Sequence, residues 1–336
     1  MRRTRPAAII PMLAFALIAA VLTIPAALSA GDISGILQAA ERQFNSGNYS
    51  SSITTLQSAV TQNPNSAETF YWLGRNYYEL RDYDNAIANA EKSVQLDPKN
   101  SLYHMWLGRA FGGKADRERS YSIAKKVKKE FQTAVQLNPS NVDARRALEE
   151  YDLDAPWIVG GDKDEAKAQV EAIAAIDPVA GHLARALQYL QEKKTDLAEN
   201  EYREVLKAKS NKLNPYFEAA MFFLNHGKPT DAEAAIQVAG QVTPNDPRLN
   251  YYRGVSRVVA GMEQSPAEEY LKSYLASTPD RSDWPTHADA RYWLGRLYEA
   301  EGKRAEAAEQ YRASLQLDPT GKETKARLQQ LEKKSR

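Results

Sequence analysis

The sequence has no cysteine, and this absence excludes disulfide-stabilised folds and thiolate metal sites. It also has almost no excess charge, because 44 lysines and arginines stand against 43 aspartates and glutamates. Such a balance gives no general electrostatic attraction to nucleic acid. The 16 prolines and 17 glycines are too few for a linker-rich or disordered chain of 336 residues. What remains is a chain long enough for a large core or for an extended array of repeats.

The first 30 residues differ in composition from the rest of the chain. Three arginines among the first five residues precede an apolar stretch, and the next charged residue is Asp32. Small residues close this stretch, which suits cleavage by signal peptidase after Ser29 or Ala30. We therefore predict that residues 1–30 are a signal peptide and that the protein is exported, with a periplasmic or extracellular location.

An uncleaved anchor is the alternative interpretation of this segment. The 24 uncharged residues from Ala7 to Ala30 are enough to span about 30 Å of hydrocarbon as a helix. Pro11 and Pro25 favour the cleaved peptide over such a helix. An anchored chain would contact the inner membrane through residues 1–30 and face the periplasm.

A motif of about 34 residues recurs through the rest of the chain. The sequence Trp-Leu-Gly-Arg occurs at 72–75, 106–109 and 293–296, and the first two copies are 34 residues apart. A tyrosine, an alanine and a proline follow two of the copies at matching offsets, at Tyr77, Ala86 and Pro98 and at Tyr298, Ala307 and Pro319. This pattern resembles the tetratricopeptide repeat, although here the tryptophan stands next to the Leu-Gly pair.

The resemblance implies an all-α fold, in which antiparallel helix pairs stack into a right-handed superhelical solenoid. Eight repeats can be placed, starting near Ile33, Ala67, Ser101, Asn141, Val179, Leu213, Pro247 and Ala288. Residues 31–319 would form this array, and residues 320–336 a final amphipathic helix that caps it. Within each repeat, small residues such as Gly74 let the two helices approach closely. Prolines such as Pro98 end the second helices, and Asn100 and Asn141 are predicted to cap the helices that follow.

Two insertions lengthen the spacing between repeats in the first half of the array. The first includes residues 112–120, where Gly112 and Gly113 predict a flexible joint, and it leads into a basic segment at 114–129. Contact of this segment with anionic headgroups or an acidic partner is one interpretation, and a solvated helix face is the simpler one.

The second insertion, residues 154–165, resembles a loop of exported bacterial tetratricopeptide proteins of unassigned activity. Its apolar residues Trp157, Ile158 and Val159 are expected to fold back onto the array, because exposing each one forfeits about 1.5–3 kcal/mol. The third insertion, residues 280–287, carries no chemistry that can be read from its residues.

The sequence contains no catalytic or metal-binding motif. None of the four histidines is spaced from another as metal ligands are; they are His104, His182, His226 and His287. A hydrolase would have to use the acids Glu149, Glu150 and Asp152, which point in different directions if they lie on one helix. We therefore predict a protein that is not an enzyme and that holds no metal or cofactor.

The family resemblance implies a concave groove lined mainly by the first helix of each pair. By register, the groove residues would be Tyr71, Arg75, Tyr78, Met105, Arg109, Leu183, Leu187, Phe217, Met221, Tyr251, Tyr292 and Arg296. A mixture of aromatic, methionine and arginine side chains is typical of a protein interface. The Lys and Asn set with which some family members grip a terminal carboxylate is not reproduced.

These observations predict a non-enzymatic scaffold that holds a protein or peptide partner of the cell envelope, and no nucleic acid. The alternative is a periplasmic receptor or accessory protein for a small ligand or polysaccharide in transport or export. An enclosed apolar cavity around Leu183, Leu187, Phe217 and Met221 would favour that alternative.

Overall fold

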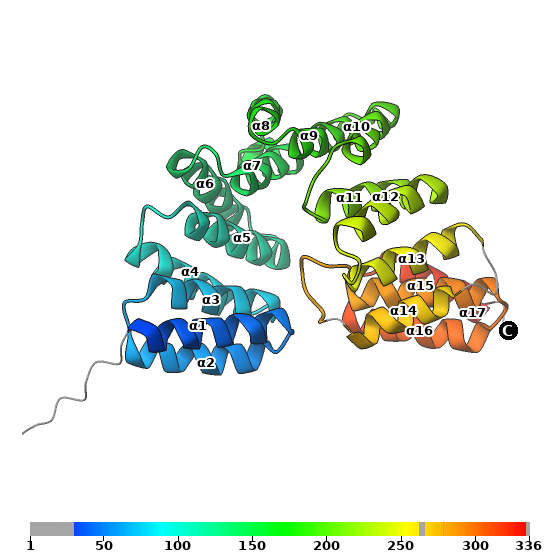
Figure 1. The fold of residues 1–336 in the computed structure, drawn as a ribbon, viewed down its shortest axis with the longest axis horizontal. Helices are drawn as coiled ribbons and strands as arrows, with labels where there is room; N and C mark the ends of the chain where they lie inside the picture. The colour runs from blue at the N-terminus through cyan, green and yellow to red at the C-terminus, as the bar shows by residue number, and fades with distance from the viewer. Residues whose placement is uncertain (1–29, 262–265, 278, 334–336) are drawn as a thin grey trace, which may run out of the picture.

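The computed structural model describes residues 30–261, 266–277 and 279–333, and within these ranges it is helical without strands. The predicted signal peptide lies outside the described residues except for Ala30. None of the described helices combines the length and the apolar character needed to cross a membrane. The helices follow one another as antiparallel pairs along a strongly curved array (Figure 1).

Eight helix pairs and a final helix make up the described chain. The pairs are α1 (Ala30–Asn45) with α2 (Tyr49–Gln62), α3 (Ala67–Glu79) with α4 (Tyr83–Leu96), α5 (Ser101–Glu118) with α6 (Tyr121–Leu137), α7 (Val142–Asp154) with α8 (Lys163–Ile176), α9 (Pro178–Gln191) with α10 (Thr195–Lys207), α11 (Asn214–Asn225) with α12 (Pro229–Val242), α13 (Arg248–Val259) with α14 (Ala267–Ser277), and α15 (His287–Ala300) with α16 (Arg304–Leu317). Helix α17 (Lys322–Lys333) packs against α16. The predicted all-α superhelical array is confirmed.

Small residues hold the two helices of a pair close together. A Cβ atom on Gly74 of α3 would lie 3.2 Å from the carbonyl oxygen of Ala86 and 3.3 Å from the amide nitrogen of Ala90, both in the backbone of α4. On α5, Gly108 lies against the ring of Phe131, which would be 2.5 Å from an added Cβ. A larger residue at either position would push the helices apart.

Local signals end and start the helices as predicted. Helix α4 ends two residues before Pro98, and the side chains of Asn100 and Asn141 accept hydrogen bonds from backbone N–H groups in the first turns of α5 and α7. Pro178 differs, because it lies in the first turn of α9 itself, where its missing N–H costs nothing.

The first two insertions take a different form from the one expected. Gly112 and Gly113 lie inside α5, which is extended to 18 residues, so the predicted flexible joint is wrong. In the second insertion, Val159 is buried, but Trp157 is 84% exposed and Ile158 50% exposed. The expectation that all three fold back is therefore wrong for two of them. They lie on a single turn of 3-10 helix, η1 (Trp157–Val159), which directs only Val159 inward.

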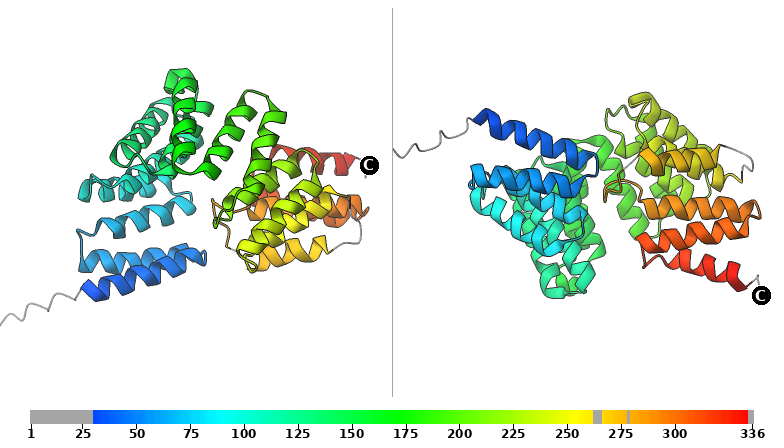
Figure 2. Two further views of the ribbon diagram at one scale, coloured as in Figure 1. Left: turned by 45° about the horizontal axis from the view of Figure 1, so that its top comes forward. Right: turned by 90° about the horizontal axis from the view of Figure 1, so that it is seen from below.

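The third insertion joins the two ends of the array. The hydroxyl of Tyr49 donates a hydrogen bond to the carbonyl oxygen of Asp280 at 3.0 Å. The backbone N–H and the hydroxyl of Ser282 both donate to the carboxylate of Glu79, each at 2.9 Å. In the views of Figure 2, this segment between α14 and α15 reaches across to the first helices.

Two further contacts fix the same segment, which we call the closing segment (residues 279–284). The guanidinium of Arg281 lies 5.4 Å from the ring centroid of Phe44 and donates to the side-chain oxygen of Asn45 at 3.3 Å. Pro279 occupies the space where a side chain on Gly47 would lie, 2.4 Å from an added Cβ. The array therefore curves until its C-terminal part touches its N-terminal part.

We expect the double variant Glu79→Ala with Arg281→Ala to open the array. It removes both acceptors of Ser282 and the side chain that lies over Phe44. Partly exposed hydrogen bonds contribute only about 1 kcal/mol each, so the helices should remain folded. Small-angle X-ray scattering should show a larger radius of gyration at unchanged helical circular dichroism.

The matched control is Arg312→Ala with Glu332→Ala, which removes an exposed ion pair of 2.8 Å between α16 and α17, far from the closing segment. An unchanged scattering curve for the first variant, or an equal change in the control, would contradict this role of the closing segment.

Candidate functional site

The predicted groove residues divide by their position relative to the small residue of each first helix. One group stands three residues before it, and five of its members are buried in the core: Tyr71, Met105, Leu183, Phe217 and Tyr251. These side chains pack mainly on neighbouring helices and leave little surface for a partner. Tyr292, in the same position, is only partly buried, and its hydroxyl donates to the Glu323 carboxylate on α17.

The second group follows the small residue directly, and most of its members are also engaged within the protein. The guanidinium of Arg75 lies 4.5 Å from the ring centroids of both Phe44 and Trp106 and donates to the Tyr71 hydroxyl. Arg296 donates to Tyr292 in the same way. These arginines stabilise the array through cation–π contacts.

Leu187 and Met221 belong to this second group and are partly buried, and Met221 packs against the core. Arg109 differs from all of them. Its side chain is exposed and lies 5.2 Å from the centroid of the Trp106 ring, and it forms no ion pair within 4 Å with the described residues. Arg109 is therefore the groove arginine that is free to meet a partner.

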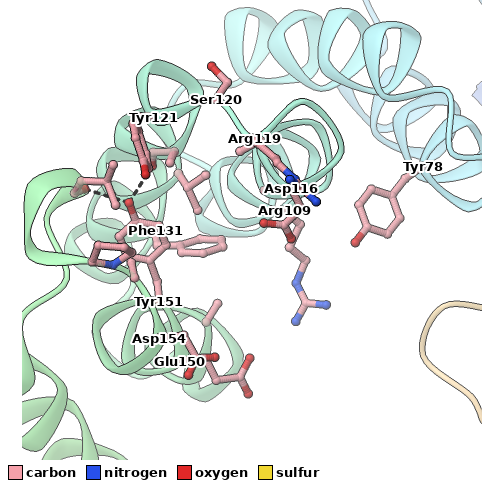
Figure 3. Close-up of a pocket in the computed structure, with 18 residues that line it drawn as sticks. Tyr78, Arg109, Asp116, Arg119, Ser120, Tyr121, Phe131, Glu150, Tyr151 and Asp154 are labelled. Atoms are coloured by element: carbon pink, nitrogen blue, oxygen red, sulfur yellow. Dashed lines mark hydrogen bonds between the residues drawn. The ribbon is translucent and has the colours of Figure 1, made fainter. Parts of the chain in front are cut away.

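Arg109 and Tyr78 line a cavity of about 730 Å³ that we call the insertion cavity (Figure 3). Both of the first two insertions contribute to its wall. The lengthened α5, the turn after it and the start of α6 supply Gly112, Ala115, Asp116, Arg119, Ser120 and Tyr121, and the loop after α7 supplies Ala155, Pro156 and Val159. The segments that interrupt the repeat thus meet at one site.

The insertion cavity has an apolar part and a charged part. Its apolar wall contains Val127, Phe131, Ala147 and Val159. Its charged residues are Arg109, Asp116, Arg119, Glu150 and Asp154. Figure 3 shows the Arg109 side chain extending between Tyr78 and Glu150. A cavity with this division suits an amphipathic ligand such as a peptide segment.

The loop that closes one side of the cavity is held in place by hydrogen bonds. The hydroxyl of Tyr151 lies 2.8 Å from the carbonyl oxygens of both Ala124 and Val159, and so links α7, α6 and η1. The ammonium of Lys128 donates to the carbonyl oxygen of Gly160 at 2.6 Å. The cavity wall is therefore built into the packing of the helices and is not a loose loop.

The three neighbouring acids of α7 occupy three different environments. Glu150 lines the cavity, and its side chain is 52% exposed. Asp152 is buried with its carboxylate 2.8 Å from the Lys128 ammonium, and burial raises its pKa to about 6. Glu149 is fully buried, and neither of its carboxylate oxygens has a hydrogen-bond partner among the described residues. A hydrolase would need its acids to converge on one point, and these three acids do not.

Glu149 occupies the position that glycine takes in other pairs. It is the eighth residue of α7, as Gly74 is of α3 and Gly108 of α5. Burial raises its pKa to about 8, although Arg146 opposes this shift.

The structure brings together a pair of residues that sequence analysis missed. Arg146 stands on α7 where Tyr71 stands on α3, and its guanidinium donates to both carboxylate oxygens of Glu218 on α11, at 3.0 and 3.2 Å. This bidentate pair links helices that are two repeats apart.

The pair of Arg146 and Glu218 also borders a second cavity of about 510 Å³, which Leu183 lines together with mostly polar and charged residues. The receptor hypothesis requires an apolar cavity around Leu183 and Phe217, and these residues do not form one.

The four histidines serve packing and local hydrogen bonding. The side chains of His104 and His182 contact Glu130 and Glu201 at 2.7 and 2.6 Å, and His226 contacts the carbonyl oxygen of Phe222. His287 lies edge-on to Tyr274. Within the described ranges, no group of three or more side chains is arranged to hold a metal ion.

A family model of the tetratricopeptide repeat matches residues 67–100 and 288–320, which contain α3 with α4 and α15 with α16. No protein with a curated description matches the chain. Among solved structures, a thermophilic tetratricopeptide protein of Thermus thermophilus is 21% identical, with 57% of this chain and 99% of that chain covered and a TM-score of 0.48.

Two more distant structures extend over larger parts of the chain. A tetratricopeptide repeat protein from Parabacteroides merdae is 14% identical, with 79% of this chain and 98% of that chain covered and a TM-score of 0.48. A chain of the APC/C hetero-tetramer Cut9-Hcn1 is 12% identical, with 90% of this chain and 57% of that chain covered and a TM-score of 0.50. At such identities the likeness concerns the fold alone.

Glu149 should make the protein less stable as pH rises. Its pKa is about 8 in the folded protein and near the ordinary glutamate value when unfolded, so between these values the folded state holds a proton that the unfolded state has lost. The free energy of unfolding therefore falls from about pH 4.5 to pH 8. We expect Glu149→Gln to raise it at pH 8 by about 1–3 kcal/mol and to change it little at pH 5.

Urea unfolding at both pH values measures this difference. Glu171→Gln on the exposed face of α8 is the control and should have little effect at either pH. Equal effects of Glu149→Gln at pH 5 and pH 8 would show that this carboxyl does not titrate as described.

Proposed function

We propose that the chain is a binding scaffold without catalytic activity, which holds a protein or peptide partner at the insertion cavity. A family model of the tetratricopeptide repeat matches two of its helix pairs, and this supports the proposal. The observation that carries this proposal is that both insertions of the first half line one cavity of about 730 Å³ beside the unpaired Arg109. Repeats alone would build a regular inner face, and the insertions add a specific pocket to it.

The chemistry of the cavity indicates what kind of segment it would take. The apolar wall of Val127, Phe131 and Ala147 would bury a large apolar side chain of the partner. Arg109 would meet a carboxylate of the partner at the rim, where a charge contributes mainly to orientation and to the rate of association. The partner is therefore an extended or helical peptide segment that carries an apolar anchor next to an acidic residue.

The location of the partner follows from the N-terminal segment. Residues 1–30 have the composition of a signal peptide, so we propose that the partner is a component of the cell envelope. The alternative, a receptor or accessory protein for a small ligand or polysaccharide in transport or export, is less well supported. Its expected apolar cavity is replaced by the packed side chains of Leu183 and Phe217.

Filling the insertion cavity should abolish partner binding. Gly112 lines the cavity within α5, and a Cβ added to it meets no atom within 4 Å, so Gly112→Leu fills the space without displacing the backbone. We expect a photo-crosslinking phenylalanine analogue at Tyr78 to form a discrete adduct in cells, and Gly112→Leu to reduce the adduct at least tenfold.

The matched control is Gly35→Leu, which places the same substitution in α1, where an added Cβ also meets no atom within 4 Å. It should leave the adduct unchanged. Equal adducts in both variants, at equal protein levels, would place the partner elsewhere.

The export proposal has its own test. Mass spectrometry of protein purified from fractionated cells should find a mature N-terminus near residue 30 or 31, in the periplasmic or extracellular fraction. Recovery of residues 2–29 in a membrane fraction would instead support the anchored form, and recovery from the cytoplasm would contradict export altogether.

A further inference from the structure

The three most exposed large apolar side chains among the described residues lie at one edge of the array. They are Trp157, Tyr121 and Ile158, exposed by 84%, 64% and 50%. Tyr121 starts α6, and Trp157 and Ile158 lie on η1, which packs against α6. We call these three side chains the apolar edge. Single exposed apolar residues are ordinary, but a group of this kind marks a contact surface.

The contacts of η1 with α6 show how the apolar edge is assembled. Tyr151 bridges the carbonyl oxygens of Ala124 and Val159, and Lys128 binds the carbonyl oxygen of Gly160. Ala124 and Lys128 are one turn apart on α6, so η1 runs along that stripe of the helix. Tyr121 is one turn before Ala124 and borders the same cavity as Pro156, the residue before η1.

A basic stripe adjoins the apolar edge. Tyr121, Lys125 and Lys129 stand at successive turns of α6, and all three are exposed. Neither lysine has a carboxylate within 4 Å among the described residues, whereas Lys114 pairs with Asp84 and Lys128 with Asp152. The basic segment of residues 114–129 thus divides into lysines that hold the fold together and lysines that remain free.

Acidic residues near the edge keep their negative charge, but their carboxylates are engaged in local hydrogen bonds. Asp162 accepts hydrogen bonds from the backbone N–H groups of Asp164 and Glu165 at the start of α8, and these bonds lower its pKa. Asp154 accepts a hydrogen bond from the side chain of Gln191. Asp164 is exposed, and its negative charge would repel an anionic surface. It lies on α8, which follows η1 in the chain, whereas Lys125 and Lys129 lie on α6 beside η1.

We propose that the apolar edge and the two free lysines dock the protein on an anionic lipid surface. Tryptophan and tyrosine favour the boundary between headgroups and acyl chains, and lysines beside them attract anionic headgroups. The apolar edge consists of exposed side chains on a turn and at the start of a helix, which suits insertion between headgroups. Val159 is the residue of η1 that is buried, and Trp157 and Ile158 remain on the outside of the loop. This proposal does not depend on the partner of the insertion cavity.

The absence of cysteine allows a test at a single position of the full-length chain. Ile158→Cys, labelled with the environment-sensitive fluorophore NBD, should show a blue shift and at least a twofold rise in emission with vesicles of phosphatidylcholine and phosphatidylglycerol. Pure phosphatidylcholine vesicles should give little change. The same label at Leu197→Cys, an exposed position on α10, should not respond, even if residues 1–30 attach the chain to the vesicle.

The electrostatic part is tested with Lys125→Gln and Lys129→Gln together in the labelled chain. Because each lysine near an anionic surface contributes a few-fold in affinity, the lipid concentration at half-maximal response should rise roughly tenfold. A label at position 158 that does not respond to anionic vesicles would overturn the proposal. An equal response at position 197, or no effect of the lysine substitutions, would overturn it as well.

Discussion

The structure depends on the close contact between the two helices of each pair, which a small side chain on the first helix permits. At Gly74 the backbone of the partner helix lies within 3.3 Å of where a Cβ would be. One pair breaks this rule, because Glu149 replaces the glycine and is buried without a hydrogen-bond partner among the described residues. The same helix carries Asp152 with its buried Lys128 contact and borders the insertion cavity. The pair with the least regular core is thus the one on which the candidate site is built, as expected where function imposes a cost on folding.

The three insertions explain how a regular array acquires specific properties. The first two meet around one cavity and also form the exposed edge of Tyr121, Trp157 and Ile158. The third binds the first helices through Ser282 and Arg281, which limits how far the array can straighten. A preset curvature lowers the entropic cost of ordering the inner face around a partner. Each departure from the repeat period therefore adds a contact or a surface that the repeats alone do not supply.

Features set by local sequence were predictable, and features set by distant contacts were not. The repeat period correctly predicted the close helix contact at Gly74, the end of α4 before Pro98 and the cap at Asn100, because each of these depends on residues nearby in the sequence. The buried position of Phe217 depends on how each pair rotates against the next, which the period does not specify. The contact of Ser282 with Glu79 joins residues 203 positions apart, and no sequence pattern in either segment predicts it. Arg109 could be predicted as a surface residue. The sequence could not show that it contacts one aromatic ring where Arg75 contacts several.

Hydrogen exchange on the full-length protein tests the central claim, that the departures from the repeat form the binding site, most directly. Amide exchange would be measured with and without a tightly binding peptide selected from a random library. The account predicts that the peptide slows exchange in the C-terminal half of α5, at the start of α6 and in the loop around η1, the segments that line the insertion cavity. Slowed exchange confined to regular repeats such as α11 to α14, with no change around residues 109–121 and 155–160, would contradict it.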